Sequence, residues 1–305
     1  MGDRKLSNEA MQKRKERLAF LKFLAFVGPH MLVFGIFVLI PIVYGLVVSF
    51  TKWDFTSSPV FIGLDNFKAL LVDEKSTYYR QFHDGLFNTL KFVIFNVPVC
   101  IALPLILALL LNVRPRGHRF FQSSLYIPTL FSITSVGIIW MQLLNKRYGI
   151  LSGFGLKVAL TTQLPYAWYS LIIMSSWWTI GTNMVIYQAA LAGVNADLYE
   201  SASMDGANFI QKACYISLPS IRFQLLFTLV TTIAGSFNVY GQPAVLTQDG
   251  TGGTPRIWVL TMYIKDLAFG SGQPIAGMAS AMAILLGLMI IVFSILQFRL
   301  ISRER

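Results

Sequence analysis

The 305-residue sequence is poor in charged residues and in the residue types that form disulfides and metal sites. Only 13% of its residues are Asp, Glu, Lys or Arg, whereas a typical soluble domain carries about 25%. The two cysteines, Cys100 and Cys214, lie in unlike surroundings, and the three histidines are scattered along the chain. Because neither set has the spacing of a disulfide framework or a metal site, we expect inert cysteines and no bound metal.

What the sequence has in abundance is apolar runs. Hydrophobic residues make up 55% of the chain, and they gather in segments of about twenty residues, long enough to cross a bilayer as helices. The predicted fold class is therefore an all-α polytopic membrane protein with six transmembrane helices. The predicted spans are 23–51, 86–112, 120–142, 166–191, 221–246 and 275–298.

The first predicted span follows a basic segment, residues 1–22, as the apolar core of a secretory signal peptide would. Such a core has only about 7–15 residues and ends at a small-residue cleavage site. The apolar run that ends near Phe50 is about twice as long and contains no such site. We therefore expect it to be retained as the first transmembrane helix.

The net charge of +11 would suggest a nucleic acid partner in a soluble protein, but here its distribution predicts membrane topology. The two ends and the segments 113–119 and 193–222 hold 15 lysines and arginines, and the other three connections hold 9. Connections rich in Lys and Arg stay in the cytoplasm, so both termini and segment 193–222 are predicted to be cytoplasmic. Lys91 lies near the end of a span, where its side chain can reach the membrane surface, and we assign it no role.

The most polar short stretch of the second half is 199–219, with the sequence YESASMDGANFIQKACYISLP. It is predicted to form two short helices around a turn at Asp205 and Gly206, because Gly tolerates positive φ and Asp can cap the second helix. Asn195 and Asp197 suit the start of the first helix. Such a unit is shaped to insert into a cleft of a soluble partner, although an ordinary amphipathic loop is the alternative.

The spacing of this stretch resembles a known motif. The motif consists of Glu-x-Ala, then three residues and a Gly, then nine residues and Ile-x-Leu-Pro. The matching residues in this sequence are Glu200, Ala202, Gly206, Ile216, Leu218 and Pro219. This is similar to the EAA loop of the membrane subunits of binding-protein-dependent ABC importers, and more narrowly of MalF-like sugar permeases. Asp205, Gly206 and Ala207 fit the usual DGA of that branch, whereas Ser201 stands where Ala is usual.

Other landmarks of that family occur in the right order. They are Ser49-Phe50-Thr51, the segment 63–67, Asn88-Thr89, a lengthened TGGP at Thr247, Gly252-Gly253 and Pro255, and the segment 277–281. The resemblance implies a MalF/MetI-like type I ABC importer permease fold. The implied organisation is a basic tail (1–22), a first helix (23–51), an extracytoplasmic loop (52–84), a five-helix core (85–298) that contains the coupling loop 193–222, and a cytoplasmic end (299–305).

The resemblance also implies a non-catalytic permease subunit in a bacterial or archaeal cytoplasmic membrane. It would work with a MalG-like second permease, two ATPase subunits that hold ATP and Mg²⁺, and an extracytoplasmic binding protein that delivers a carbohydrate. The residues expected to couple to the ATPase are Glu200, Ser201, Ala202, Asp205, Gly206 and Ala207. No cofactor is expected on this chain, because the Gly-rich segment 250–254 lacks the Gly-Lys-Ser/Thr of a phosphate loop.

Polar stripes on the predicted helices are candidates for a solute path. Ser and Thr also join packed membrane helices, so packing is the alternative role for each residue. The candidates are Thr129, Ile133, Trp178, Thr179, Thr182, Asn183, Thr232, Ser236, Asn238 and Tyr240. The family landmarks place Trp178, Thr179, Thr182, Thr232 and Ser236 near positions that contact sugar in the maltose permease. Hydroxyls beside an aromatic ring suit a neutral sugar.

Other functional classes make predictions that this sequence does not meet. A secondary transporter would carry intramembrane carboxylates or paired broken helices, and an intramembrane enzyme would carry a nucleophile with a base, or metal ligands, at membrane depth. The predicted spans contain no Asp or Glu. Within the ABC class, a permease for glycerol phosphate or another non-sugar solute remains the alternative.

Overall fold

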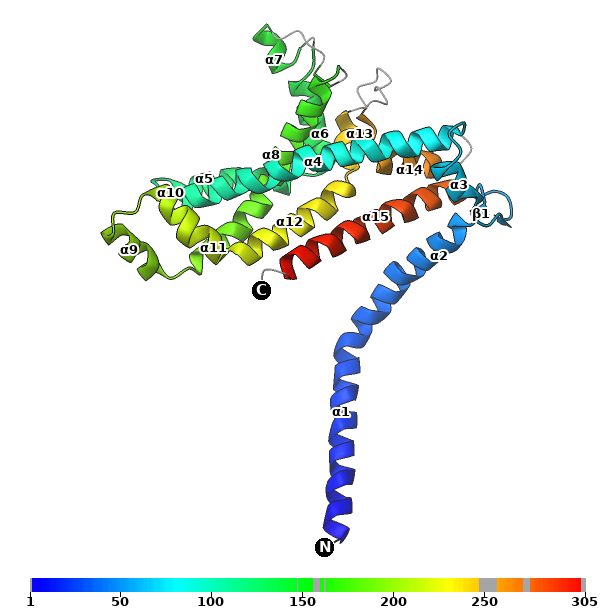
Figure 1. The fold of residues 1–305 in the computed structure, drawn as a ribbon, viewed down its shortest axis with the longest axis horizontal. Coiled ribbons are helices and arrows are strands. Elements are labelled where there is room, and N and C mark those ends of the chain that lie inside the picture. The colour runs from blue at the N-terminus through cyan, green and yellow to red at the C-terminus, as the bar shows by residue number, and fades with distance from the viewer. Residues whose placement is uncertain are drawn as a thin grey trace.

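The computed structural model describes residues 2–146, 148–155, 160–161, 163–246, 257–270 and 275–302. These residues are mostly helical, and a short antiparallel pair of strands joins Thr51 to Phe61 and Lys52 to Val60 (Figure 1). In chain order the elements are α1 (Gly2–Phe34), the π-helix η1 (Gly35–Leu39), α2 (Ile40–Ser49), β1 (Thr51–Lys52), β2 (Val60–Phe61), α3 (Asp65–Leu71), α4 (Thr77–Asn112), α5 (His118–Tyr126), the 3-10 helix η2 (Ile127–Leu130), α6 (Ile133–Leu143), α7 (Ile150–Gly153), α8 (Tyr166–Ala192), α9 (Ala196–Met204), α10 (Phe209–Lys212), the π-helix η3 (Ala213–Ser217), α11 (Leu218–Ser220), α12 (Arg222–Phe237), α13 (Gly241–Leu246), α14 (Leu260–Phe269) and α15 (Ala276–Ser302).

Three helical segments are long and apolar enough to cross a membrane: Lys15–Ser49, Thr77–Asn112 and Ala276–Arg299. The number rises to five if each of two bent helix pairs is one span. Helix α8 has 27 residues and is long enough, but its Ser, Thr, Asn and aromatic residues make it less apolar than those three. The all-α membrane class predicted from the apolar runs therefore agrees with the structure, at three to five candidate spans within the described residues.

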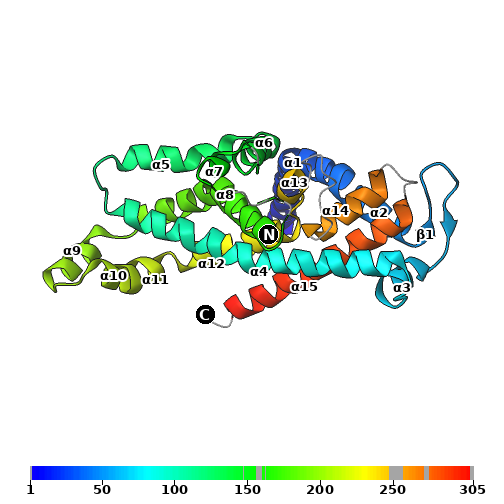
Figure 2. The ribbon, with the colours of Figure 1, turned by 90° about the horizontal axis from the view of Figure 1, so that it is seen from above.

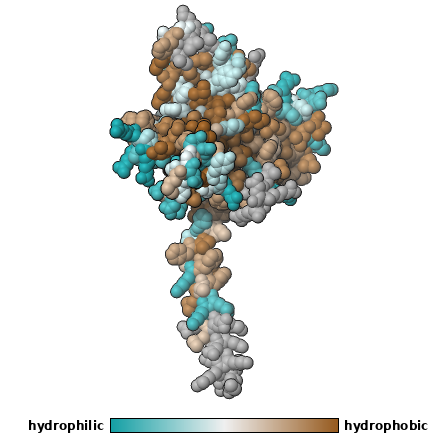
Figure 3. Space-filling view, turned by 60° about the vertical axis from the view of Figure 1, so that its left-hand side comes forward, coloured by the Kyte–Doolittle hydropathy of each residue, from teal (hydrophilic) through white to brown (hydrophobic). Residues whose placement is uncertain are grey.

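The first long helix projects away from the rest of the molecule (Figure 1). Residues 2–22, expected as a polar tail, are already helical and continue into the apolar part of α1. The apolar side chains of this region are exposed, with Phe26 at 91%, and only the following helix α2 packs against α15. Figure 3 shows brown, apolar side chains over much of the helical body, and tan to brown side chains with a few teal, polar ones along the projecting helix.

Helix α4 is the central element, and it packs against α8, α12 and α14. It begins at Thr77 rather than at Leu86 as predicted, so the predicted loop 52–84 ends inside a helix. The earlier start has a local cause, because the Ser76 hydroxyl accepts a hydrogen bond from the Tyr78 amide at 3.2 Å. Gly85 then lets α4 approach α14 closely, since a Cβ there would lie 2.8 Å from the Tyr263 ring.

Two spans predicted as single helices are broken. The prediction of one helix over 120–142 is wrong, because α5–η2 and α6 meet at an angle of 102°. Pro128 lies at the start of η2, and the Ser132 hydroxyl caps α6 by accepting from the Ser135 amide at 3.2 Å. The predicted helix 221–246 is also interrupted, because α12 ends at Phe237 and α13 begins at Gly241.

Candidate functional site

Segment 193–222 forms the predicted pair of short helices, α9 and α10, around a turn. Asn195 caps α9 by accepting a hydrogen bond from the Asp197 amide at 3.0 Å. Gly206 has a φ of +77°, as predicted for the turn. The expectation that Asp205 caps the second helix is wrong. Asn208 caps α10 in a reciprocal capping box, in which its side chain and that of Gln211 each accept from the other residue's amide.

Hydrogen bonds from α9 to η3 and to α10 hold this segment as one unit. The Tyr199 hydroxyl lies 2.9 Å from the Ser217 hydroxyl, and the Lys212 ammonium donates to the Ser203 hydroxyl at 2.6 Å. Figures 1 and 2 place α9 and α10 at one end of the molecule, away from β1 and α3. We call this segment, residues 195–220, the terminal helical unit.

The terminal helical unit presents the motif residues on its surface. Glu200, Ser201, Asp205 and Gly206 are exposed, and Ala202 and Ala207 are half-buried. Around them stand exposed apolar side chains: Leu198, Met204, Phe209, Ile210 and Tyr215. The carboxylate of Glu200 makes no ion pair with any described residue, so it is available to a partner. Exposed apolar side chains beside polar ones are typical of surfaces that contact another protein or the membrane.

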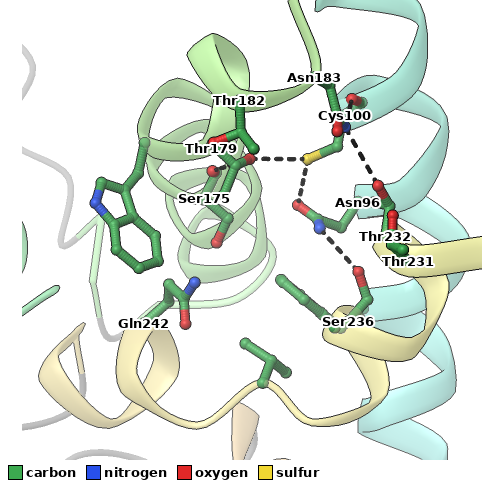
Figure 4. A pocket seen from close by; sticks show the side chains of 14 residues that line it. Asn96, Cys100, Ser175, Thr179, Thr182, Asn183, Thr231, Thr232, Ser236 and Gln242 are labelled. Carbon is green, nitrogen blue, oxygen red and sulfur yellow. Dashed lines mark hydrogen bonds between the residues drawn. The ribbon is translucent and has the colours of Figure 1, made fainter. Parts of the chain in front are cut away.

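A cavity of about 380 Å³ lies among α4, α8, α12 and α13 (Figure 4). Helix α12 begins after a sharp bend, where it meets the preceding helical segment Phe209–Ser220 at 73°, and lines the cavity with residues of its last two turns. The lining residues are Phe92, Asn96, Cys100, Ser175, Trp178, Thr179, Thr182, Asn183, Thr231, Thr232, Gly235, Ser236, Val239 and Gln242. None of them carries a charge, so amides, hydroxyls, one thiol and aromatic rings define the chemistry of this inner cavity.

Side-chain hydrogen bonds connect α4, α8 and α12, three of the helices around the inner cavity (Figure 4). The Asn96 amide donates to the Ser236 hydroxyl at 3.3 Å and so joins α4 to α12. The Asn183 amide donates to the Cys100 carbonyl at 2.9 Å and to the Thr232 hydroxyl at 3.2 Å. Such bonds fix the positions of the polar groups that a solute would meet. The Ser175 hydroxyl is buried and has no partner among the described residues.

Six of the ten predicted path residues line the inner cavity: Trp178, Thr179, Thr182, Asn183, Thr232 and Ser236. The other four lie elsewhere. Thr129 and Ile133 pack closely against glycines, because a Cβ at Gly181 or Gly241 would lie 3.0 or 2.9 Å from them, respectively. Asn238 donates to the Ala234 carbonyl of its own helix at 2.9 Å, and Tyr240 is 37% exposed.

Sequence reasoning missed the contribution of α4 to the inner cavity. Asn96 and Cys100 lie four residues apart in this apolar helix and therefore face the same side. A lone amide such as Asn96 within an apolar run was an available signal, because buried polar groups in membranes need partners. The Cys100 thiol lies 3.5 Å from the Thr179 hydroxyl. The role of Gln242 had no signal in the sequence, because it depends on the break between α12 and α13.

Comparisons with known proteins agree with this arrangement. A model of the family described as binding-protein-dependent transport system inner membrane component matches residues 69–305. The TGGP landmark at Thr247, Gly252, Gly253 and Pro255 lies outside the described residues.

Similar proteins cover nearly the whole chain. A probable starch degradation products transport system permease protein, AmyD of Thermoanaerobacterium thermosulfurigenes, is 30% identical over 92% of this chain and 93% of its own length. The arabinooligosaccharides transport system permease protein AraP of Bacillus subtilis is 29% identical over 90% of this chain and 87% of its own. A solved bacterial alginate ABC transporter, in complex with its alginate pentasaccharide-bound periplasmic protein, has a similar chain. The two chains superpose with a TM-score of 0.79 at 26% sequence identity. The match covers 95% of this chain and 97% of the chain in the alginate transporter.

Proposed function

Because this chain belongs to the family of binding-protein-dependent transport system inner membrane components, we propose that it is the permease subunit of an ATP-driven carbohydrate importer. An extracytoplasmic binding protein would deliver the sugar or oligosaccharide. The observation that carries the substrate class is the inner cavity, where hydroxyls, amides and Trp178 surround a space without any charged side chain. The names of the starch and arabinooligosaccharide permeases that it resembles support the same class.

The terminal helical unit is proposed to couple the permease to ATP hydrolysis in separate subunits. Glu200 would pair with a polar or basic group of the ATPase, and the exposed apolar side chains would supply contact area. Gly206 would provide the turn between α9 and α10 and allow close approach of the partner. A second, MalG-like permease and two ATPase subunits holding ATP and Mg²⁺ complete the proposed assembly.

Six membrane spans are proposed, with α8 as the span that is less apolar than the others. Its polar residues are explained by the inner cavity, because Ser175, Thr179, Thr182 and Asn183 face that space rather than lipid. Both termini are proposed to be cytoplasmic. The charge distribution supports this placement, as does the C-terminal end of α15, which lies toward the same end as α11 in Figure 1.

The proposed function is tested by reconstituting the chain with its natural permease, ATPase and binding-protein partners. ATP hydrolysis and uptake into vesicles would be measured with maltotriose, arabinotriose, lactose and glycerol 3-phosphate. We expect at least one neutral saccharide to stimulate both activities, with uptake that requires ATP and is unaffected by a proton gradient. Stimulation by glycerol 3-phosphate alone would show that the substrate is not a carbohydrate. Proton-driven uptake without ATPase subunits would contradict the proposal of an ATP-driven importer.

Replacing Ser236 by Ala is expected to change solute preference. The Ser236 hydroxyl accepts from Asn96 at the wall of the inner cavity. Loss of one neutral hydrogen bond costs about 1 kcal/mol, which corresponds to a roughly fivefold weaker half-saturation for the preferred saccharide. Ser294→Ala on α15, outside the cavity, is the matched control. If Ser236→Ala lowers only the yield of assembled complex and leaves the order of saccharides unchanged, the residue packs helices and does not contact solute.

A further inference from the structure

A second cavity, also of about 380 Å³, lies near the other end of α4 from the terminal helical unit. Its lining comes from the N-terminal half of α4, from the start of α8 and the residues just before it, and from α14: Asp84, Phe87, Asn88, Lys91, Leu164, Trp168 and Tyr263. We call it the outer cavity. It differs from the inner cavity in containing one acidic and one basic side chain.

The outer and inner cavities both border the same buried apolar cluster. Trp168 lines the outer cavity and Phe92 lines the inner one, and both belong to the cluster that includes Leu171, Met174 and Val239. The two cavities therefore lie along the same helices, α4 and α8, with shared apolar packing between them. A solute moving from the outer end of α4 toward the inner cavity would meet the outer cavity first.

The polar groups of the outer cavity have unused hydrogen-bonding capacity. The Lys91 ammonium lies 4.7 Å from the centre of the Trp168 ring, and within the described part of the chain it forms no ion pair. Asp84 is likewise without an ion pair there. Tyr263 is only 7% exposed, and burial raises its pKa, with a smaller contribution from the Asp84 carboxylate. Asn88 uses its amide hydrogen on the Trp258 carbonyl at 2.8 Å, which orients its side chain.

This set of groups favours a neutral polyol over a charged ligand. An anionic ligand would be attracted by Lys91 but repelled by Asp84. A cationic ligand would be attracted by Asp84 but repelled by Lys91. A sugar hydroxyl both donates and accepts, so neighbouring hydroxyls can donate to the carboxylate and accept from the ammonium. Phe87, 67% exposed, offers an apolar ring to the C–H face of a sugar.

We propose that the outer cavity is a saccharide-binding site, at which a neutral sugar unit binds before it reaches the inner cavity. Asp84 and Lys91 hold its hydroxyls, Tyr263 adds a further hydroxyl, and Phe87 contacts the face of the sugar ring. The inference rests on the proposed carbohydrate import and adds to it a second, outer contact site for the same solute. It also gives Lys91 a role, which the sequence alone did not.

The test uses the full complex of this chain with its partners and three photoreactive probes. The probes are maltotriose, arabinotriose and lactose, each carrying a small diazirine, and cross-linked peptides are mapped by mass spectrometry. We expect labels in the segments 84–91 and 164–168 as well as in 175–183. Lys91→Met should raise the probe concentration for half-maximal labelling of the outer segments about tenfold, since a charge-assisted hydrogen bond is lost. Asp84→Asn is a second, independent variant with the same expected direction.

Lys68→Met is the matched control, because Lys68 lies on α3, away from the outer cavity, and its side chain forms an exposed ion pair with Asp65 at 3.3 Å. It should leave both labelling patterns as in the unmodified complex. Labelling of 175–183 without 84–91 would overturn the outer site and leave the carbohydrate importer standing. Labelling of neither region by any probe would overturn both. Equal labelling in Lys91→Met, Asp84→Asn and the control would also overturn the assigned contacts.

Discussion

Replacing Gly206 by Val should reduce ATP-driven uptake by about ten- to a hundredfold while the chain stays folded in the membrane. Gly206 has a φ of +77°, in the left-handed region that a β-branched residue avoids. A Cβ at this position would meet nothing within 4 Å, so the cost in the isolated chain is backbone strain of about 1–3 kcal/mol confined to the turn. The measurement compares uptake, ATP hydrolysis and thermal stability of the reconstituted complex.

A Gly206→Asn variant separates two causes of that loss, because Asn tolerates the left-handed conformation better than other residues with a side chain. If the turn alone matters, the Asn variant should restore most of the uptake. If an ATPase surface must approach the backbone closely, the Asn variant should remain uncoupled although its turn is intact. Normal uptake in the Val variant would contradict a coupling role for this turn.

The helical class and the terminal helical unit were accessible from sequence because each depends on local chemistry. Long apolar runs are explained by the membrane alone. The turn at Gly206 follows from the conformational freedom of Gly, and the start of α9 follows from the Asn195 cap. The start of α4 was also local, since Ser76 caps it, but the polar residues that follow Ser76 concealed a helix that extends beyond the apolar run.

What could not be predicted depends on contacts between distant segments. Pro128, Ser132 and Gly241 mark where the bend after η2 and the break between α12 and α13 occur. The directions that the chain takes after them, such as the 102° turn into α6, depend on packing between distant elements, as of α13 against α6. The inner cavity shows the same limit. Hydroxyls spaced four residues apart on α12 indicated one of its walls, whereas Asn96 and Gln242 join it only because α4 and α13 pack there. Thr129 and Ile133 were also predicted to line the solute path, but in the structure they fill space beside Gly181 and Gly241.

Replacing Gly277 by Ala should be the most destabilising of the small substitutions proposed. A Cβ at Gly277 would lie 1.8 Å from the Thr51 carbonyl oxygen, a backbone atom that cannot rotate away. The same carbonyl accepts a hydrogen bond from the buried Asn66 amide at 2.9 Å, as does that of Ser49. The added methyl group must therefore displace the junction between α2 and β1 from the start of α15. Overpacking that forces side chains and backbone to shift typically costs about 1–3 kcal/mol, and a 1.8 Å clash with a backbone atom places this substitution at the upper end of that range.

The matched control for Gly277→Ala is Gly287→Ala in the same helix, where a Cβ would meet nothing within 4 Å. Ala is favoured over Gly inside a helix by roughly 0.5–1 kcal/mol, so the control should be neutral or slightly stabilising. Thermal unfolding in detergent reports the loss of stability, and protease cleavage between residues 52 and 64 reports the displacement of the junction between α2 and β1. We expect a lower unfolding temperature and faster cleavage only in the Gly277 variant. Since Asn66→Ala removes the hydrogen bonds at the same junction without a clash, it should accelerate cleavage as well. Unchanged cleavage in both variants would show that this junction does not hold the first helix against the core.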